Sequence, residues 1–189
     1  MAPAGYREPL YRRVLGDAWD RLPEPIQRMH VLNGTMAASG LATVERGHSF
    51  LARLIAWVFR FPKAGRNVPV KVTFTALGAG ELWTRDFAGS RFSSFQQKGV
   101  GRSERLVGER FGPFAFALAA VLEQDRLLLI PRGWSLFGLP LPTVLAPFGN
   151  TFEHVDDEGR FAFHVEVCVQ LAGVVVRYRG YLIPDVPSA

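Results

Sequence analysis

Charged and aromatic side chains alternate along one predicted strand and therefore share a face. Within 81–87 this face carries Glu81, Trp83, Arg85 and Phe87, because successive side chains of a strand point to opposite sides of its sheet. If the face points into a cavity, the charged pair could hold the polar head of a small molecule and the rings its apolar body. The alternative is structural: Arg85 pairs with Glu81 at a barrel end or stacks on the indole.

A second set of polar side chains alternates near the C-terminus. Arg177, Arg179 and Tyr181 share one face of a predicted strand. Pointing into a barrel, they could clamp the carboxylate of a ligand. On a solvated face, Glu166 of the preceding strand would instead pair with Arg177 or Arg179.

Two histidines and a carboxylate flank a predicted turn at 156–159. Glu153, His154 and His164 could be neighbours in one hairpin. A histidine beside a carboxylate is the minimum for proton transfer, so these residues are acid–base candidates. They also suit an ordinary surface pair, since the strand register depends on the length of the turn.

Motifs of the common enzyme classes are missing from the sequence. There is no Gly-x-Ser-x-Gly, His-Glu-x-x-His or Cys-x-x-Cys, and the four histidines are too scattered to define a metal site. The string at 99–101 lacks the full Gly-x-Gly-x-x-Gly of a dinucleotide site. Cys168 alternates with valines, which indicates a buried, unreactive thiol. We therefore assign no metal and no cofactor, and the sequence leaves open whether the protein is an enzyme.

A long run of strands must position these residues. From Val68 onward apolar residues recur with a period of two, and turn sequences rich in Gly, Pro and Asp separate strand candidates that include Arg102–Phe111 and Thr143–Asp156. A meander of about nine strands usually curls or closes to protect its edges. We predict a mainly β, α+β fold, with a barrel or strongly curved sheet over 68–183 like that of fatty-acid-binding proteins or lipocalins. The alternative is a START-like helix-grip fold, although no long C-terminal helix is evident.

Helices are predicted before this meander, in residues 1–62. They cover most of the first thirty residues, and one short strand follows at Gly40–Gly47. A clear amphipathic helix spans Ser49–Phe61, and we expect it to pack on the sheet and act as a lid through a stripe formed by Leu51, Leu54, Ile55, Val58 and Phe59. Alternatively, Trp57, Phe59, Phe61 and two arginines lie at a lipid surface.

Composition indicates the number of domains, the class of partner and the location of the protein. A chain of 189 residues suits one domain spanning 1–189, and its 48% apolar and 12% aromatic residues can fill a core or line a cavity. The net charge of +5 comes mainly from arginines spread along the chain without a nucleic-acid motif, so we expect no nucleic-acid partner. The N-terminus lacks the apolar stretch of a secretory signal, which favours a cytoplasmic location.

Several strings occur together: Leu10-Tyr11 with Leu15-Gly16, Pro62 before Val68-Pro69-Val70, the segment 81–87, Gly138-Leu139-Pro140-Leu141-Pro142, and Tyr178-Arg179-Gly180-Tyr181-Leu182. As a set they resemble the bacterial domain of unknown function 4166 family over nearly the whole chain. Members occur free-standing or fused to saccharopine-dehydrogenase-like or short-chain reductases. The resemblance implies a reductase partner and a role in the redox metabolism of small, lipid-like molecules, but it transfers no catalytic residue.

The leading hypothesis is that the barrel binds an apolar or amphipathic small molecule, as an accessory to a reductase. Its support is the surplus of aromatic residues and the face with Trp83 and Arg85. One rival is a metal-free isomerase or cyclase that uses Arg85, Glu81 or the histidines as acid–base groups. The other is a peripheral membrane protein that contacts lipid through the helix at 49–61.

Overall fold

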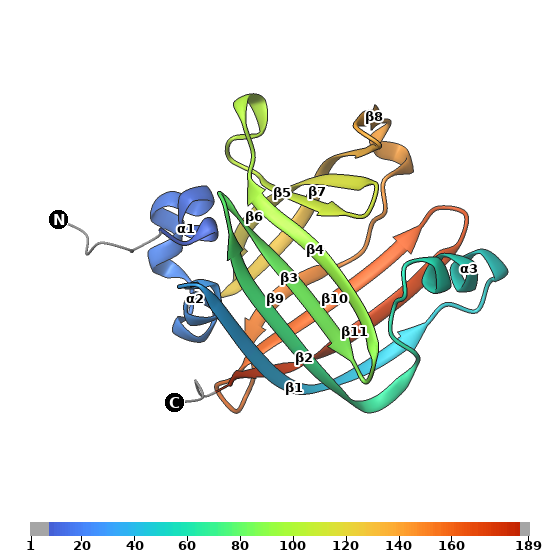
Figure 1. Ribbon diagram of the computed structural model, residues 1–189, viewed down its shortest axis with the longest axis horizontal. Coiled ribbons are helices and arrows are strands. Elements are labelled where there is room, and N and C mark those ends of the chain that lie inside the picture. Colours follow the sequence, from blue (N-terminus) through green and yellow to red (C-terminus); the bar gives the residue numbers. More distant parts are fainter. Residues whose placement is uncertain (1–7, 186–189) are drawn as a thin grey trace.

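Ten antiparallel strands close into a barrel with helices at both ends (Figure 1). The computed structural model describes residues 8–185. The strands are β1 (Thr35–Arg46), β2 (Gly65–Leu77), β3 (Gly80–Phe87), β4 (Ser90–Lys98), β5 (Val107–Phe111), β6 (Phe114–Glu123), β7 (Arg126–Leu136), β9 (Thr151–Val155), β10 (Phe161–Val169) and β11 (Gly173–Pro184). The short β8 (Leu139–Leu141) pairs with β7 only.

The order around the barrel is β6-β5-β4-β3-β2-β1-β11-β10-β9-β7, and a pairing of β6 with β7 closes it. Closure removes the exposed sheet edges that a meander of this length would otherwise present. The predicted barrel is confirmed, and the helix-grip alternative is not observed. The first strand is longer than predicted, since β1 starts at Thr35 and pairs along its length with β2 and β11.

The strand predicted at 143–156 is wrong in its first half. A 3-10 turn, η3 (Thr143–Leu145), occupies that part, and β9 begins only at Thr151. Pro142 and Pro147 have no backbone N–H to donate to a neighbouring strand, which explains why pairing starts later. Likewise, η2 (Gly101–Ser103) precedes β5 where a strand from Arg102 was predicted.

Three short helical segments close one end of the barrel: α1 (Leu10–Leu15), η1 (Gly16–Arg21) and α2 (Glu24–His30). The helix predicted before Pro23 breaks at Gly16, which has a positive φ of 56°. Their buried side chains join the barrel core: Leu10, Tyr11, Trp19, Ile26, Met29 and His30. The part of the predicted helix at 1–7, and the N-terminal start of the chain, lie outside the described residues.

The predicted amphipathic helix is α3 (Phe50–Val58), at the opposite end of the barrel (Figure 1). Ser49 caps it, because its hydroxyl accepts a hydrogen bond from the Ala52 amide at 3.1 Å and donates one to the Ala172 carbonyl at 2.8 Å. Among the described residues no helix is both long enough and apolar enough to cross a membrane.

The expected packing stripe of α3 is wrong for Leu51, Leu54 and Val58, which are exposed. The helix contacts β11 and the turn before it through Ala52 and Ala56, which are fully buried against Ala172 and Val175, and Ile55 packs beside them. Ile55 and Phe59 also line the cavity described below. This face is chosen because the chain just before α3 lies very close to β11. A Cβ added at Gly47 would clash with the Val174 carbonyl and with Ala52. Only small side chains fit at such a contact.

Candidate functional site

The barrel encloses a cavity of about 420 Å³ between the N-terminal helices and α3. Most of its wall is aromatic or aliphatic, with Phe74, Phe87, Phe92, Phe111 and Phe163 among the lining residues. Only a few charged or polar residues interrupt this wall: Arg85, Ser94, Gln96, Glu109, Thr151, Glu153, Glu166 and Tyr178. Small-molecule sites in proteins commonly have this size and a mostly apolar lining with a few polar groups.

Arg85 of β3 is the one Lys or Arg among residues 8–185 that lines the cavity. Its Nη1 donates to Ser94 Oγ at 2.9 Å, and its Nη2 lies 3.8 Å from Glu109 Oε1. The guanidinium carbon is 5.2 Å from the ring centroid of Trp83 and 5.8 Å from that of Phe92. These ring faces and polar partners fix a positive charge inside an otherwise apolar space.

A hydrogen-bonded chain runs from the N-terminal helices to the cavity wall. The Tyr11 hydroxyl donates to Gln96 Oε1 at 3.0 Å, and Gln96 Nε2 donates to Glu109 Oε1 at 3.2 Å. Burial, with a smaller effect of nearby carboxylates led by Glu153, holds the pKa of Tyr11 well above its usual value. Tyr11 is therefore a neutral hydrogen-bond donor that ties α1 to β4.

His30 and Glu153 form a buried pair at the same end of the cavity. His30 Nε2 lies 2.6 Å from Glu153 Oε2, and neither residue is more than 6% exposed. The imidazole packs on Tyr11, with ring centroids 3.9 Å apart, and its Nδ1 has no hydrogen-bond partner among the described residues. Glu153 also lines the cavity, so the pair places an acid–base group at the wall.

The predicted face of β3 does point into the barrel. Trp83, Arg85 and Phe87 line the cavity. Glu81 is buried beside them and accepts a hydrogen bond from Trp83 Nε1 at 3.1 Å, but it does not line the cavity. Its carboxylate thus orients the indole rather than facing the enclosed space, and ligand binding by this face stays a prediction.

The inward orientation considered for Arg177, Arg179 and Tyr181 is corrected. On β11 the residues that line the cavity are Tyr178 and Leu182, so strand alternation places the arginines and Tyr181 on the outer face. Arg177 donates to Glu166 Oε1 at 3.0 Å and to Glu45 Oε2 at 3.0 Å.

Arg179 and Tyr181 complete this outer face. Arg179 is exposed, and the guanidinium carbon of Arg160 lies 3.7 Å from the ring centroid of Tyr181.

The inner face of β11 contributes Tyr178 to the cavity wall. Burial raises the pKa of Tyr178 to about 12, so its hydroxyl keeps its proton there.

The trio Glu153, His154 and His164 is separated by the sheet. Glu153 points inward and pairs with His30, whereas the two histidines flank Phe152, with ring centroids 5.4 Å and 5.0 Å from it. Partial burial lowers the pKa of both histidines. The acid–base pair therefore forms with a histidine that the sequence reasoning passed over. Its signal was the apolar spacing of Ile26, Met29 and His30 on α2, which marks His30 as inward-facing.

Within residues 8–185 no group of three or more His, Cys, Asp or Glu side chains is arranged to hold a metal ion. Cys168 is buried, and burial raises the pKa of its thiol, which keeps the sulfur protonated and weakly nucleophilic.

Comparison with known proteins places this architecture in a family. No curated protein and no solved structure matches the chain. One family model does match, over residues 22–182, and this span includes α2, α3 and the strands from β1 to all but the end of β11. The chain therefore belongs to the family described as Domain of unknown function (DUF4166).

Proposed function

We propose that this protein binds a neutral amphipathic small molecule inside the barrel. The observation that carries the proposal is the uneven wall of the cavity, in which polar side chains gather around Arg85 while rings line the rest. A ligand with a polar head and an apolar body matches such a wall, since the head finds hydrogen bonds and the body is removed from water.

The balance of charges at the head site favours a neutral group. The guanidinium of Arg85 lies 3.8 Å from the carboxyl group of Glu109, and Glu153 lines the same cavity. An anionic head would compete with Glu109 for Arg85, whereas a hydroxyl can accept from Arg85 and donate to a glutamate. The proposal thus replaces the carboxylate clamp expected of Arg177, Arg179 and Tyr181 by a hydroxyl site at Arg85.

Arg85→Met tests the head site. The variant keeps the apolar stem of the side chain but removes its five donors, so we expect affinity for 1-dodecanol to fall by about tenfold, as for a lost charge-assisted hydrogen bond. Tryptophan fluorescence titration measures it, because Trp83 lines the cavity. Arg179→Met, on the outer face, is the matched control and should bind as the wild type does. Equal affinity of the Arg85→Met protein would contradict this assignment.

The choice of ligand tests the neutral head. The wild-type protein should bind 1-dodecanol more tightly than dodecanoate of the same chain length, because the ligand carboxylate would be repelled by Glu109, which lies beside Arg85. A preference for dodecanoate would contradict the neutral-head assignment while leaving the cavity a binding site. The family resemblance implies a reductase partner. In this proposal the reductase supplies or consumes the bound molecule.

An enzymatic role is the second candidate, and one observation favours it. The His30–Glu153 pair puts a carboxyl group with a buried histidine behind it at the cavity wall, an arrangement suited to proton transfer in a metal-free isomerase or cyclase. Mass spectrometry of ligand recovered after incubation separates the two candidates: unchanged ligand supports binding alone, and a rearranged product that Glu153→Gln fails to form supports catalysis.

A further inference from the structure

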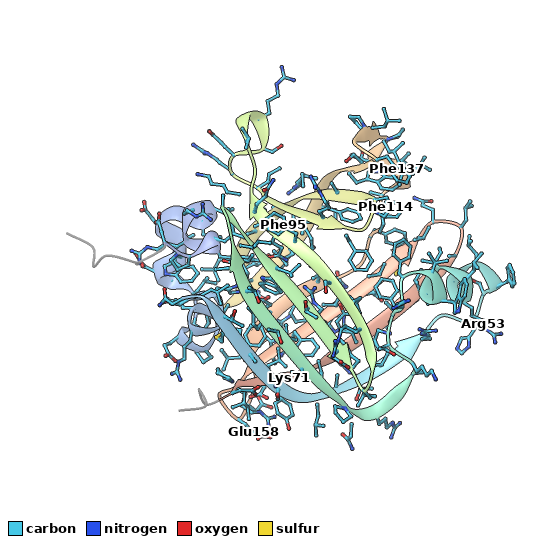
Figure 2. All side chains as sticks on the ribbon, in the orientation of Figure 1. Arg53, Lys71, Phe95, Phe114, Phe137 and Glu158 are labelled. Atoms are coloured by element: carbon cyan, nitrogen blue, oxygen red, sulfur yellow. The ribbon has the colours of Figure 1, made fainter. Side chains whose placement is uncertain are left out.

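Large apolar side chains are concentrated on the outside of one end of the barrel. Of the sixteen large hydrophobic residues exposed in the described part of the chain, eleven lie on α3, on the β7–β8 turn and the segment after it, or on the β10–β11 turn. We call these three regions the mouth rim. Its most exposed members are Phe50 (83%), Trp57 (74%), Phe137 (81%) and Leu171 (88%). Figure 2 labels Phe137, in the β7–β8 turn, and Arg53, on α3, at this end. An exposed apolar patch of this kind marks an interaction site.

The mouth rim is continuous with the cavity. A groove of about 630 Å³ runs between α3 and the β5–β7 strands, with exposed Leu54, Val58 and Phe137 among its residues. Ile55, Phe59 and Phe114 line both this groove and the cavity. An apolar path therefore connects the outer surface of the rim with the proposed binding space.

Charge along the barrel is asymmetric, and the rim is its basic end. The sequence has no Asp or Glu in residues 47–80 or 126–152, which include α3 and the β7–β8 region. Arg53, Arg60 and Arg132 of these segments are exposed. None of the three has an ion-pair partner among the described residues.

Three acidic residues near the rim are paired with arginines: Asp86 with Arg91, and Glu45 and Glu166 with Arg177. Other acidic residues lie toward the opposite end, on η1, on α2 and in the β9–β10 turn, where Figure 2 labels Glu158. The rim thus combines apolar side chains with unpaired positive charge.

We infer that the mouth rim docks on a bilayer containing anionic phospholipids, and that the ligand moves between the bilayer and the cavity along the groove. The identity of the transported ligand rests on the proposed function. The choice of a bilayer as partner rests on the apolar and basic side chains of the mouth rim. Exposed aromatic side chains insert among the acyl chains near the headgroups, and arginines bind the phosphates. A bilayer satisfies both features of the rim, and it is also where amphipathic molecules accumulate.

Vesicle co-sedimentation of the full chain tests the docking. The wild type should pellet with vesicles of phosphatidylcholine and phosphatidylglycerol, and much less with phosphatidylcholine alone or at high salt. Phe50→Ser with Trp57→Ser should lower the vesicle partition coefficient by about tenfold or more, because two large exposed rings no longer leave water. Val100→Ser, at a residue 86% exposed but outside the rim, is the matched control and should bind as the wild type does.

A double arginine variant tests the electrostatic contribution to vesicle binding. Arg53→Gln with Arg132→Gln should reduce binding to the anionic vesicles by roughly fivefold per arginine. Arg21→Gln on η1, at the other end of the barrel, should leave it unchanged.

Titration of each variant with 1-dodecanol in the absence of vesicles keeps the two proposals distinguishable. Retained dodecanol binding with lost vesicle binding supports the rim as the docking surface. Wild-type protein that binds dodecanol but never pellets with anionic vesicles would overturn the docking and leave the proposed function standing. Self-association in analytical ultracentrifugation that the Phe50→Ser/Trp57→Ser variant loses, without vesicle binding, would also overturn it and assign the rim to a second copy of the chain.

Discussion

His30→Leu should lower the free energy of unfolding by about 3–5 kcal/mol, because it leaves a buried carboxyl group without its partner. Glu153 is 6% exposed, and its contact with His30 Nε2 at 2.6 Å is its one side-chain hydrogen bond among those described. Leucine is close to histidine in size, so the packing against Tyr11 changes little while the polar contact disappears. Urea unfolding followed by fluorescence measures the change.

Two further variants separate the polar contact from the packing. His154→Leu, on the outer side of the same sheet, should change stability by no more than about 0.5 kcal/mol. The double variant His30→Leu/Glu153→Leu should recover much of the loss, since removing both partners leaves no unpaired buried group. If His30→Leu is as stable as the wild type, the pair contributes nothing to the fold and its description as a coupled unit fails.

Ala56→Asp should release α3 from the barrel and speed ligand exchange. Ala56 is fully buried against Ala172 and Val175, so an aspartate there would place an unpaired charge in an apolar contact at a cost of several kcal/mol. Because the docked surface of α3 is small, we expect local undocking, with faster hydrogen exchange of the α3 amides and a dodecanol dissociation rate raised by about tenfold or more.

Phe50→Asp is the matched control on the same helix. Phe50 is 83% exposed and lines neither the cavity nor the groove, so its charge remains in water. This variant should keep the melting temperature and the dodecanol dissociation rate of the wild type, while vesicle binding by the mouth rim falls. An Ala56→Asp protein with unchanged dissociation rate would show that α3 does not control access to the cavity.

The fold was predictable because its signals are local. Period-two hydrophobicity and the turn sequences between strands, such as those at 78–80 and 88–90, appear in the sequence and predict a closed meander. The packed face of α3 was not predictable in this way. Periodicity identifies the largest apolar residues, whereas close approach to the β10–β11 turn selects the small side chains of Ala52 and Ala56. Leu54 and Val58 are exposed, so burial in the barrel core does not account for their apolar side chains.

The site was predictable where one strand builds it. Alternation along β3 correctly grouped Trp83, Arg85 and Phe87, since the relation depends only on backbone geometry. The partners of that face come from distant segments. Tyr11 lies 85 residues from Gln96, and His30 lies 123 residues from Glu153. Such contacts depend on how the helices fold over the barrel end, which no local pattern encodes.

The two faces of β11 show the same limit. Both the set with Arg177 and Arg179 and the set with Tyr178 and Leu182 alternate correctly, so the pattern alone could not tell which one faces inward. The register with β10 and β1 places Arg177 opposite both Glu166 and Glu45 on one face. The side chains of Tyr178 and Leu182 on the other face are buried in the core, and this burial decides which face points inward.

Native mass spectrometry of the protein mixed with 1-dodecanol tests the central claim, that the barrel cavity holds one neutral amphipathic molecule. We predict a one-to-one complex for the wild type, and its loss in Leu129→Trp, where a larger side chain fills the space that Leu129 lines. The circular dichroism spectrum of the variant should stay that of the folded barrel. Absence of the complex in the wild type, or equal retention by the folded Leu129→Trp protein, would contradict binding in the cavity.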